Sequence, residues 1–274
     1  MGAAHLAPGP HCRGAHCLAN GIRLHYLDFN PDAAGAPILL LPGITSPAAT
    51  WAFVAQPLAA TRRVIVPDLR GRGLSESRAG LGYALEDYAQ DALGLVDGLG
   101  LRQPVILGHS MGARIAIRLA ARSPGVVSRL ILADPPLSGP GRAPYPTPLS
   151  SYLAAHEAAS RGATVEAFRP LTPGWSDAQI ALRLEWLPTC SVEAITRSHA
   201  GFHEEDIFPD LPLLDVPTLL VFALRAKVVS ADAASEMVRR MPNGRAIGID
   251  AGHMIPWDNL DDFLTAITAF LDQG

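Results

Sequence analysis

The sequence predicts an α/β protein with a mostly parallel central sheet, helices on both faces of that sheet, and a helical insertion capping one end of the strands. Short, fully apolar runs are typical of strands buried on both sides, and segments with helical spacing separate them. Between residues 135 and 215 the strands stop and helical segments follow one another. A chain of 274 residues, 49% of them hydrophobic, is large enough to bury one such core.

The first half of the chain alternates between strands and helices. Residues 1–20 are rich in Gly, Pro, Ala and His, and we expect them to be frayed. The turn signal Asn20-Gly21 then introduces the first strand. The expected elements are, in order, strand 22–28, strand 38–41, helix 48–59, strand 64–66, helix 85–99, strand 105–107 and helix 113–121.

The second half contains the insertion. Strand 130–133 ends at Asp134-Pro135-Pro136, prolines cluster over 135–148, and helical segments follow. The remaining expected elements are strand 218–222, helix 231–240, strand 246–249 and helix 260–271. We therefore divide the chain into a first core part (1–134), a helical cap (135–215) and a second core part (216–274).

Composition limits the partners and the compartment. A net charge of −4 with no run dense in Lys or Arg argues against nucleic acid and against an anionic membrane surface. The N-terminus does not read as a signal peptide, and no apolar stretch is long enough to span a bilayer. Three cysteines, Cys12, Cys17 and Cys190, form no disulfide framework, which favours the cytoplasm. His11-Cys12 and His16-Cys17 lack a second ligand cluster, so we expect no metal site. The oligomeric state stays open.

Gly108-His109-Ser110-Met111-Gly112 matches the pattern G-x-S-x-G between a strand and a helix. In α/β-hydrolases this context defines a nucleophile elbow, a strained turn that exposes the serine at a helix N-terminus. The alternative is a surface serine in a glycine-rich turn. We predict that Ser110 is a nucleophile.

A serine nucleophile needs a base, and in α/β-hydrolases the chain order is Ser, acid, His. His253 follows the last predicted strand, on the loop before the final helix, whereas His199 and His203 fall in the cap. A lone loop histidine can also be an ordinary surface residue. The placement favours His253 as the base.

The orienting acid commonly follows the strand at 218–222, but residues 223–227 contain no carboxylate. The next acid, Asp232, is predicted to begin a helix, where the helix dipole favours a negative charge. Asp134 stands instead at the tip of the preceding strand, where active sites of open α/β sheets gather. It could also simply start a turn before two prolines. We predict Asp134 as the acid.

Acyl transfer also needs donors for the developing oxyanion. One should be the backbone N–H of Met111, directly after the nucleophile. The other should come from the loop after strand 38–41, where we choose the N–H of Ile44. No metal or organic cofactor is needed for this chemistry.

Beyond the elbow, several motifs carry a closer resemblance, which extends from about Asn20 to Leu271. They are residues 41–47, 70–75, 108–114, 134–136, 138–142, 175–177, 202–204 and 251–257. The chain resembles the α/β-hydrolase superfamily and, within it, the N-formylmaleamate deformylases of aerobic nicotinate breakdown. The resemblance implies hydrolysis of N-formylmaleamate to maleamate and formate. It also implies an acid at the position of Asp134.

A substrate that carries a carboxylate calls for an arginine. Arg183 falls on one arc of a predicted cap helix with Ile180, Leu184 and Leu187, and Trp186 lies close to that arc. We therefore propose Arg183 and Trp186 as substrate-binding residues. Alternatively, Arg183 reaches the cap edge or pairs with a nearby glutamate, Glu185 or Glu204. The arginines of the elbow helix, Arg114, Arg118 and Arg122, are expected on a solvated face.

Two other functions remain open at this point. The same triad could serve a carboxylesterase or a carbon–carbon bond hydrolase acting on another small carboxylated substrate. The chain could also be a small-molecule receptor of this fold, although an intact set of Ser110, Asp134 and His253 counts against that.

Overall fold

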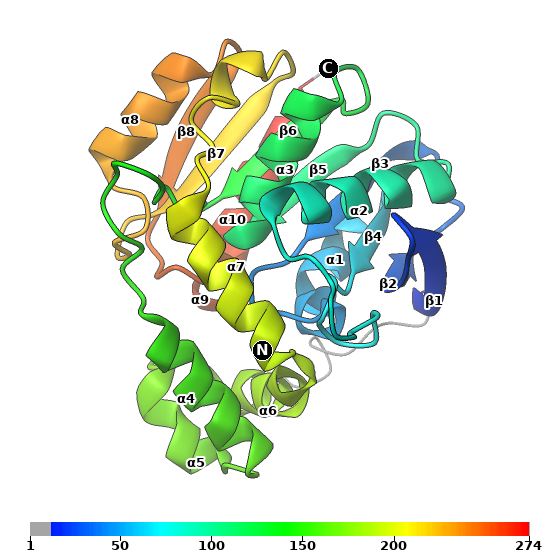
Figure 1. Cartoon of the computed structure of the whole chain (residues 1–274). Helices are drawn as coiled ribbons and strands as arrows, with labels where there is room; N and C mark the ends of the chain where they lie inside the picture. The colour runs from blue at the N-terminus through cyan, green and yellow to red at the C-terminus, as the bar shows by residue number, and fades with distance from the viewer. Residues whose placement is uncertain (1–11, 274) are drawn as a thin grey trace.

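The computed structural model describes residues 12–273 and contains an eight-stranded sheet (Figure 1). The strands lie in the order β1-β2-β4-β3-β5-β6-β7-β8. All neighbours from β4 to β8 are parallel, whereas β1 and β2 are antiparallel to each other, and β2 to β4. The strands are β1 (Cys12–Ala19), β2 (Ile22–Phe29), β3 (Gly35–Leu41), β4 (Arg62–Pro67), β5 (Val105–His109), β6 (Arg129–Ala133), β7 (Thr218–Ala223) and β8 (Gly244–Ile249). The predicted mostly parallel sheet is confirmed.

One element differs from the sequence prediction. Residues 12–19 were expected to be frayed but form β1, which pairs with β2 along its whole length. Asn20 and Gly21 both have positive φ (48° and 75°) and close the hairpin, as tight hairpin turns require. Because β1 is an edge strand with mostly exposed side chains, it carries little apolar signal. Residues 1–11 lie outside the described part.

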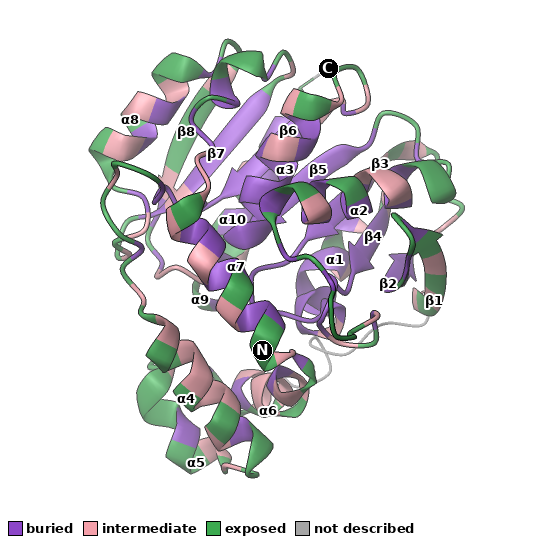
Figure 2. Cartoon of the chain, in the orientation of Figure 1, coloured by how far each residue is buried: buried purple, intermediate pink, exposed green. Residues whose placement is uncertain are grey.

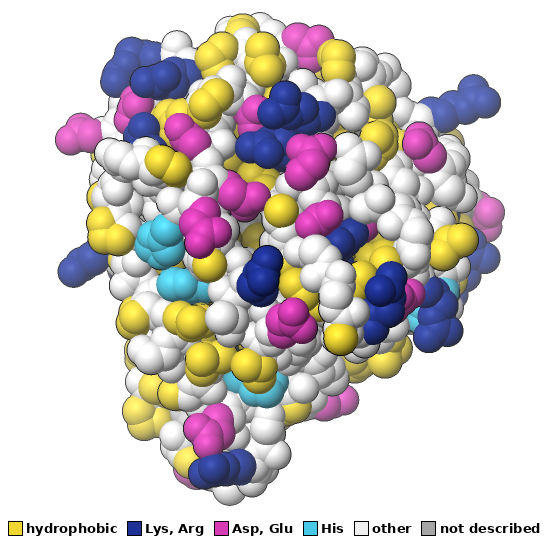
Figure 3. Space-filling view, viewed as in Figure 1, with side chains coloured by type: hydrophobic (Ala, Val, Ile, Leu, Met, Phe, Trp, Pro, Cys, Tyr) yellow, Lys and Arg dark blue, Asp and Glu magenta, His cyan; other side chains and the backbone are white. Residues whose placement is uncertain are grey.

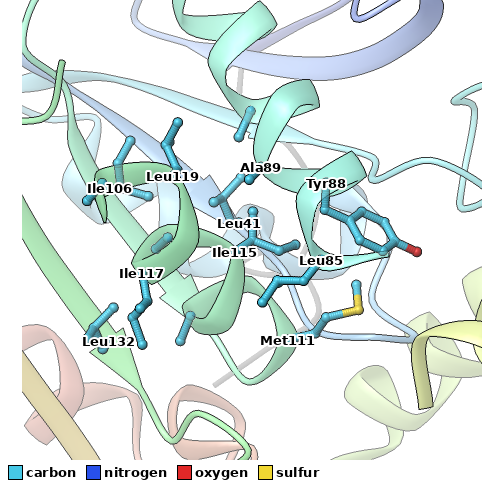
Figure 4. Close-up of a cluster of buried hydrophobic side chains, with 14 of the residues drawn as sticks. Leu41, Leu85, Tyr88, Ala89, Ile106, Met111, Ile115, Ile117, Leu119 and Leu132 are labelled. Carbon is cyan, nitrogen blue, oxygen red and sulfur yellow. The ribbon is translucent and has the colours of Figure 1, made fainter. Parts of the chain in front are cut away.

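Helices cover both faces of the sheet, which explains why the inner strands are apolar throughout. Leu39 and Leu41 of β3 point into one buried cluster, and the intervening Ile38 and Leu40 into a second. The first cluster is covered by α2 (Leu85–Gly98), α3 (Met111–Arg122) and α8 (Ala231–Arg240), and the second by α1 (Ala52–Leu58), α9 (Ile255–Asp258) and α10 (Leu260–Leu271). Figure 4 shows part of the first cluster, with Leu41, Ile106 and Leu132 packed against α2 and α3. A short 3-10 turn (Ala48–Trp51) precedes α1.

Between β6 and β7 the described chain contains helices and no strand. They are α4 (Leu149–Ser160), α5 (Val165–Phe168), α6 (Asp177–Trp186) and α7 (Val192–Glu204), joined by 3-10 segments at Arg169–Leu171 and Leu187–Thr189, with a third at Leu211–Leu213. Helices α4, α5 and α6 form a lobe beyond the ends of the strands, and α7 runs from that lobe along the core (Figure 1). The lobe is largely exposed or half-buried, in contrast to the buried sheet (Figure 2).

The surface carries no large patch of one charge on the face drawn in Figure 3, where acidic and basic side chains are interspersed. Within residues 12–273, none of the helices has the length and apolar character needed to cross a membrane.

Candidate active site

The predicted nucleophile lies in a sharp turn between β5 and α3. Ser110 has φ 54°, a left-handed conformation that is strained for a side-chain-bearing residue. The flanking glycines are required by close backbone approach: a Cβ on Gly108 would lie 2.3 Å from the Gly112 carbonyl oxygen, and one on Gly112 would lie 1.9 Å from that of Leu41. The G-x-S-x-G spacing therefore reflects how tightly β3, β5 and α3 pack around the serine.

Ser110, His253 and Asp134 are connected by hydrogen bonds in one line. The Ser110 Oγ lies 2.9 Å from Nε2 of His253, and Nδ1 of the same ring lies 2.6 Å from Asp134 Oδ2. The other carboxylate oxygen of Asp134 accepts a bond of 3.2 Å from the backbone N–H of Ala223 at the end of β7. Asp134 is fully buried at the tip of β6, so its orientation is fixed from two sides. These are the three side chains that the sequence predicted to meet.

Two other carboxylates of the second core part, Asp232 and Asp250, are not bonded to His253. Asp232 lies in the first turn of α8, whose N-cap is Ser230, as predicted for a residue at a helix start. Asp250 forms an exposed ion pair with Arg225 at 2.8 Å. The residues described between Ala223 and Val229 supply no acid to His253.

The loop that carries His253 is hydrogen-bonded to His109, a residue that the sequence analysis did not single out. His109 Nε2 donates to the backbone carbonyl of His253 at 2.8 Å, and the two rings lie 5.0 Å apart. Burial lowers the pKa of His109 to about 3, so this imidazole is neutral near neutral pH. His109 occupies the first variable position of the G-x-S-x-G pattern, so the motif itself does not indicate a role for it.

The two residues predicted to supply oxyanion donors lie near the serine: Met111 follows it in the chain, and Ile44 lines the same cavity. Met111 is the first residue of α3, so no carbonyl of that helix can accept its N–H. For the N–H of Ile44, no acceptor is found within residues 12–273. The carbonyls around this second donor are held by two arginines: Arg72 Nε donates to the Ile44 carbonyl at 3.0 Å, and Arg183 donates to the Thr45 carbonyl.

A cavity of about 340 Å³ opens in front of Ser110 and His253. Its walls come from the core loop 43–46 and from residues between 147 and 183 of the insertion. The insertion contributes mostly apolar side chains, including Phe168, Leu171 and Trp175. Such a small apolar space with few polar groups is typical of a site for a small molecule.

Of the two predicted substrate-binding residues, the structure brings only one to this cavity. Arg183 lines it, and Nη2 bonds Thr45 Oγ1 at 2.5 Å. No carboxylate pairs with Arg183 in the described chain, and burial lowers its pKa. Trp186, the last residue of α6, is not among the residues that line the cavity, whereas Trp175 is.

Two tyrosines near His253 were missed. The Tyr145 hydroxyl lies 3.5 Å from His253 Nε2 and 3.0 Å from the Tyr152 hydroxyl, and Tyr152 lines the cavity. Tyr145 belongs to the proline-rich segment and Tyr152 to α4. A tyrosine in such a segment has no spacing relative to the serine motif, so only the folded insertion reveals the contact.

The elbow helix also corrects the sequence analysis. Arg114 was expected on a solvated face but is almost fully buried. Its guanidinium donates to the carbonyls of Pro136 (2.8 Å), Ser138 (3.0 Å), Gly201 (3.4 Å) and Glu205 (2.6 Å). Burial lowers its pKa to about 10. Of the three arginines in this stripe, only Arg122 is exposed.

The described residues offer no ready place for a metal. Within 12–273, no group of three His, Cys, Asp or Glu side chains is arranged to hold an ion. Cys12, Cys17 and Cys190 are free thiols.

Comparison with known proteins identifies the family of the chain. A family model described as the alpha/beta hydrolase fold matches residues 36–260. N-formylmaleamate deformylase from Pseudomonas putida is 45% identical over 261 residues, 95% of this chain and 97% of that protein. The crystal structure of an N-formylmaleamic acid deformylase variant from Pseudomonas putida S16 has a TM-score of 0.89 and 48% identity, covering 93% of this chain and all of that one. The 2-(acetamidomethylene)succinate hydrolase of Mesorhizobium japonicum is 28% identical over 260 residues, 90% of this chain and 91% of that protein.

The similarity extends over the sheet, the elbow and the insertion alike, since both coverage values are near complete. The resemblance predicted from the motifs is confirmed. The chain belongs to the α/β-hydrolase family and is an enzyme of the hydrolase class.

Proposed function

We propose that this enzyme hydrolyses N-formylmaleamate to maleamate and formate. The observation that carries the proposal is the line from Asp134 through His253 to Ser110, which ends in a small cavity whose wall holds an arginine without a carboxylate partner in the described chain. The relative with 45% identity is named for this activity, and it matches the chain over the insertion as well as the core. Substrate choice in this fold resides in such insertions more than in the elbow.

The first half-reaction forms a formyl-enzyme. Ser110 Oγ attacks the formyl carbon while His253 Nε2 takes its proton, and Asp134 stabilises the resulting imidazolium. The oxyanion accepts hydrogen bonds from the N–H groups of Ile44 and Met111. When the carbon–nitrogen bond breaks, its electron pair goes to nitrogen, and His253 returns the proton to that atom. Maleamate leaves, and Ser110 carries a formyl ester.

The second half-reaction uses water in place of serine. His253 removes a proton from water, hydroxide adds to the formyl carbon, and the same two N–H groups stabilise the oxyanion. The carbon–oxygen bond to Ser110 breaks, the serine regains its proton from His253, and formate leaves.

The leaving group of the first half-reaction also favours this chemistry. Its nitrogen is conjugated to a second carbonyl, so it leaves more readily than a simple amine.

Arg183 suits the carboxylate of this substrate. A guanidinium has five N–H donors, and two of its nitrogens bond Thr45, so further donors remain for an anion. A charge-assisted hydrogen bond of this kind is stronger than one between neutral groups. The arginine thereby ties the bound substrate to the loop that supplies the Ile44 N–H.

The decisive measurement is formate release from N-formylmaleamate by the purified enzyme. Ser110→Ala should lower kcat by at least about 10⁴-fold while leaving the fold intact, because no bulk is added at the elbow. Arg183→Leu should raise KM for N-formylmaleamate roughly 30-fold or more, and far less for the neutral N-formylacetamide. Undiminished formate release by Ser110→Ala would rule out acyl-enzyme chemistry.

The alternatives give different results in the same assay. Preferential turnover of p-nitrophenyl esters or vinylogous diketones would favour an esterase or a carbon–carbon bond hydrolase. Binding of N-formylmaleamate without any product over hours would favour a receptor. We further place the reaction in the cytoplasm, a compartment in which the three free cysteines would stay reduced.

A further inference from the structure

Tyr145 and Tyr152 extend the hydrogen-bonded line beyond His253, on the side of the ring away from Asp134. The Tyr145 hydroxyl is 3.5 Å from His253 Nε2, and the Tyr152 hydroxyl is 3.0 Å from that of Tyr145. Tyr145 is buried, whereas Tyr152 belongs to the cavity wall. The mechanism given above uses neither hydroxyl.

Which of these groups donates and which accepts depends on the protons that each of them carries. Burial raises the pKa of both tyrosines, so both hydroxyls keep their protons. At rest His253 Nε2 accepts from Ser110, and after proton transfer Nε2 becomes a donor. If Tyr145 donates to Tyr152, the Tyr145 oxygen can accept from the imidazolium, and the Tyr152 proton is free for the cavity. Each bond in such a chain strengthens the next.

We propose that Tyr152 donates a hydrogen bond to the amide oxygen of the leaving group, and that Tyr145 positions it. The inference rests on the proposed function and adds a catalytic residue to that site. As the carbon–nitrogen bond breaks, its electron pair spreads from nitrogen onto the neighbouring carbonyl oxygen. A donor at that oxygen stabilises the departing amide before His253 delivers its proton to nitrogen. Tyr152 keeps its own proton throughout.

The surroundings of Tyr152 fit a short cis-configured substrate. Burial is the largest influence on the pKa of Tyr152, and the charge of Arg183 lowers it in opposition, so the two groups are close enough to interact. Maleamate carries its amide and its carboxylate on neighbouring cis carbons. With the carboxylate at Arg183, the amide oxygen would lie by Tyr152 and the scissile nitrogen toward His253.

The test compares two formyl donors that share the acyl group and differ in the leaving group. N-formylmaleamate releases an amide, whereas p-nitrophenyl formate releases a phenolate that needs no donor. Tyr152→Phe should lower kcat for N-formylmaleamate about 10- to 100-fold, the usual effect of one lost hydrogen bond to a developing charge. It should leave p-nitrophenyl formate within about 2-fold. Tyr145→Phe should show the same selectivity with a smaller loss.

Tyr83→Phe is the matched control. The Tyr83 hydroxyl is also buried, Tyr83 is not one of the cavity-lining residues, and its hydroxyl has no partner within the described residues. Both substrates should be turned over by Tyr83→Phe as by the wild type.

A second measurement uses N-formylmaleamate alone. Rapid quenching should show less accumulated formyl-enzyme in Tyr152→Phe, because only the step with the leaving amide slows. Equal losses on both substrates, no loss on N-formylmaleamate, or equal slowing of formation and hydrolysis of the formyl-enzyme would each overturn the role of Tyr152. If the wild type released no formate from N-formylmaleamate, the proposed function itself would fail.

Discussion

Two of the predicted catalytic residues adopt a backbone conformation that is rare for residues other than glycine. Ser110 and Asp134 have φ 54° and 46°, each costing on the order of 1–3 kcal/mol. Their backbones are nevertheless fixed by the adjacent strands: Ser110 N–H donates to Ala133 and Asp134 N–H to Val221, both at 2.8 Å. The parallel sheet therefore holds both residues at the edge where His253 can join them.

We predict that Asp134, and not Asp232, orients His253. Asp134→Asn keeps the shape of the side chain but offers an amide that favours the wrong tautomer of the ring, so kcat for formate release should fall about 10⁴-fold. Asp232→Asn changes only the first turn of α8 and should keep activity within a few-fold. Steady-state kinetics on both variants decides the matter, and an unchanged kcat in Asp134→Asn would contradict the assignment.

The sequence could predict the residues whose role depends on chain order. Ser110 follows from a strand–turn–helix motif, His253 from its place after the last strand, and Asp134 from the missing carboxylate at 223–227. Tyr145 and Tyr152 could not be found in this way, because their approach to His253 depends on how the insertion folds over the core. Trp186 does not line the cavity for the same reason: helical spacing indicates a face of the helix, but not which residue reaches a cavity.

Among the elements, Arg114 connects α3 to two segments that frame the site. Its donors satisfy the carbonyls of Gly201 and Glu205 at the C-terminal end of α7, and those of Pro136 and Ser138 after β6. The Gly201 carbonyl also accepts the Glu205 N–H at 3.1 Å, and the C-terminal end of a helix attracts cations. The predicted solvated stripe failed here because a periodic pattern cannot show that α7 returns to cover the helix. Strand β1 escaped prediction for the opposite reason, since its exposed edge has no apolar pattern.

We expect the loss of this connection to destabilise the fold. Arg114→Met keeps most of the aliphatic length but leaves several buried carbonyls unpaired, so the free energy of unfolding should fall by about 2–4 kcal/mol. Arg122→Met, at the exposed C-terminal end of the same helix, should change it by less than about 0.5 kcal/mol. Urea denaturation measures both. Equal stability of the two variants would show that the four hydrogen bonds contribute little.

Over the whole molecule, the sequence predicted the architecture well because the sheet is covered on both faces. A fully apolar strand such as β3 must be covered on both faces of the sheet. This requirement predicts a sheet between two layers of helices (Figure 2). The lobe of α4 to α6 lacks that constraint, since many of its side chains are half-buried. Its helices were expected, and Arg183 was expected at the site, but the approach of Tyr152 was not.

The stability of the whole molecule should depend on pH through one buried histidine. His109 lies at the centre of the sheet edge with its pKa lowered to about 3 by burial, against an ordinary value near 6.5 in the unfolded chain. Between these values the unfolded chain binds one more proton than the folded one at this position. The contribution of His109 to the free energy of unfolding is therefore fully present above about pH 6.5. It is lost as the pH falls toward 3, by up to about 1.4 kcal/mol per pH unit.

A substitution isolates this contribution from that of the other titrating groups. His109→Gln retains an N–H that can donate to the His253 carbonyl but has no proton to gain. Urea unfolding of both proteins between pH 4 and 6 should show that the free energy of unfolding falls more steeply with decreasing pH in the wild type. The difference in slope should correspond to about one proton, or about 1.4 kcal/mol per pH unit. The carboxylates and the remaining histidines titrate alike in both proteins and cancel in that difference. Parallel curves would mean that His109 accepts a proton in the folded state, and the bond to the His253 loop would then have to survive a charged ring.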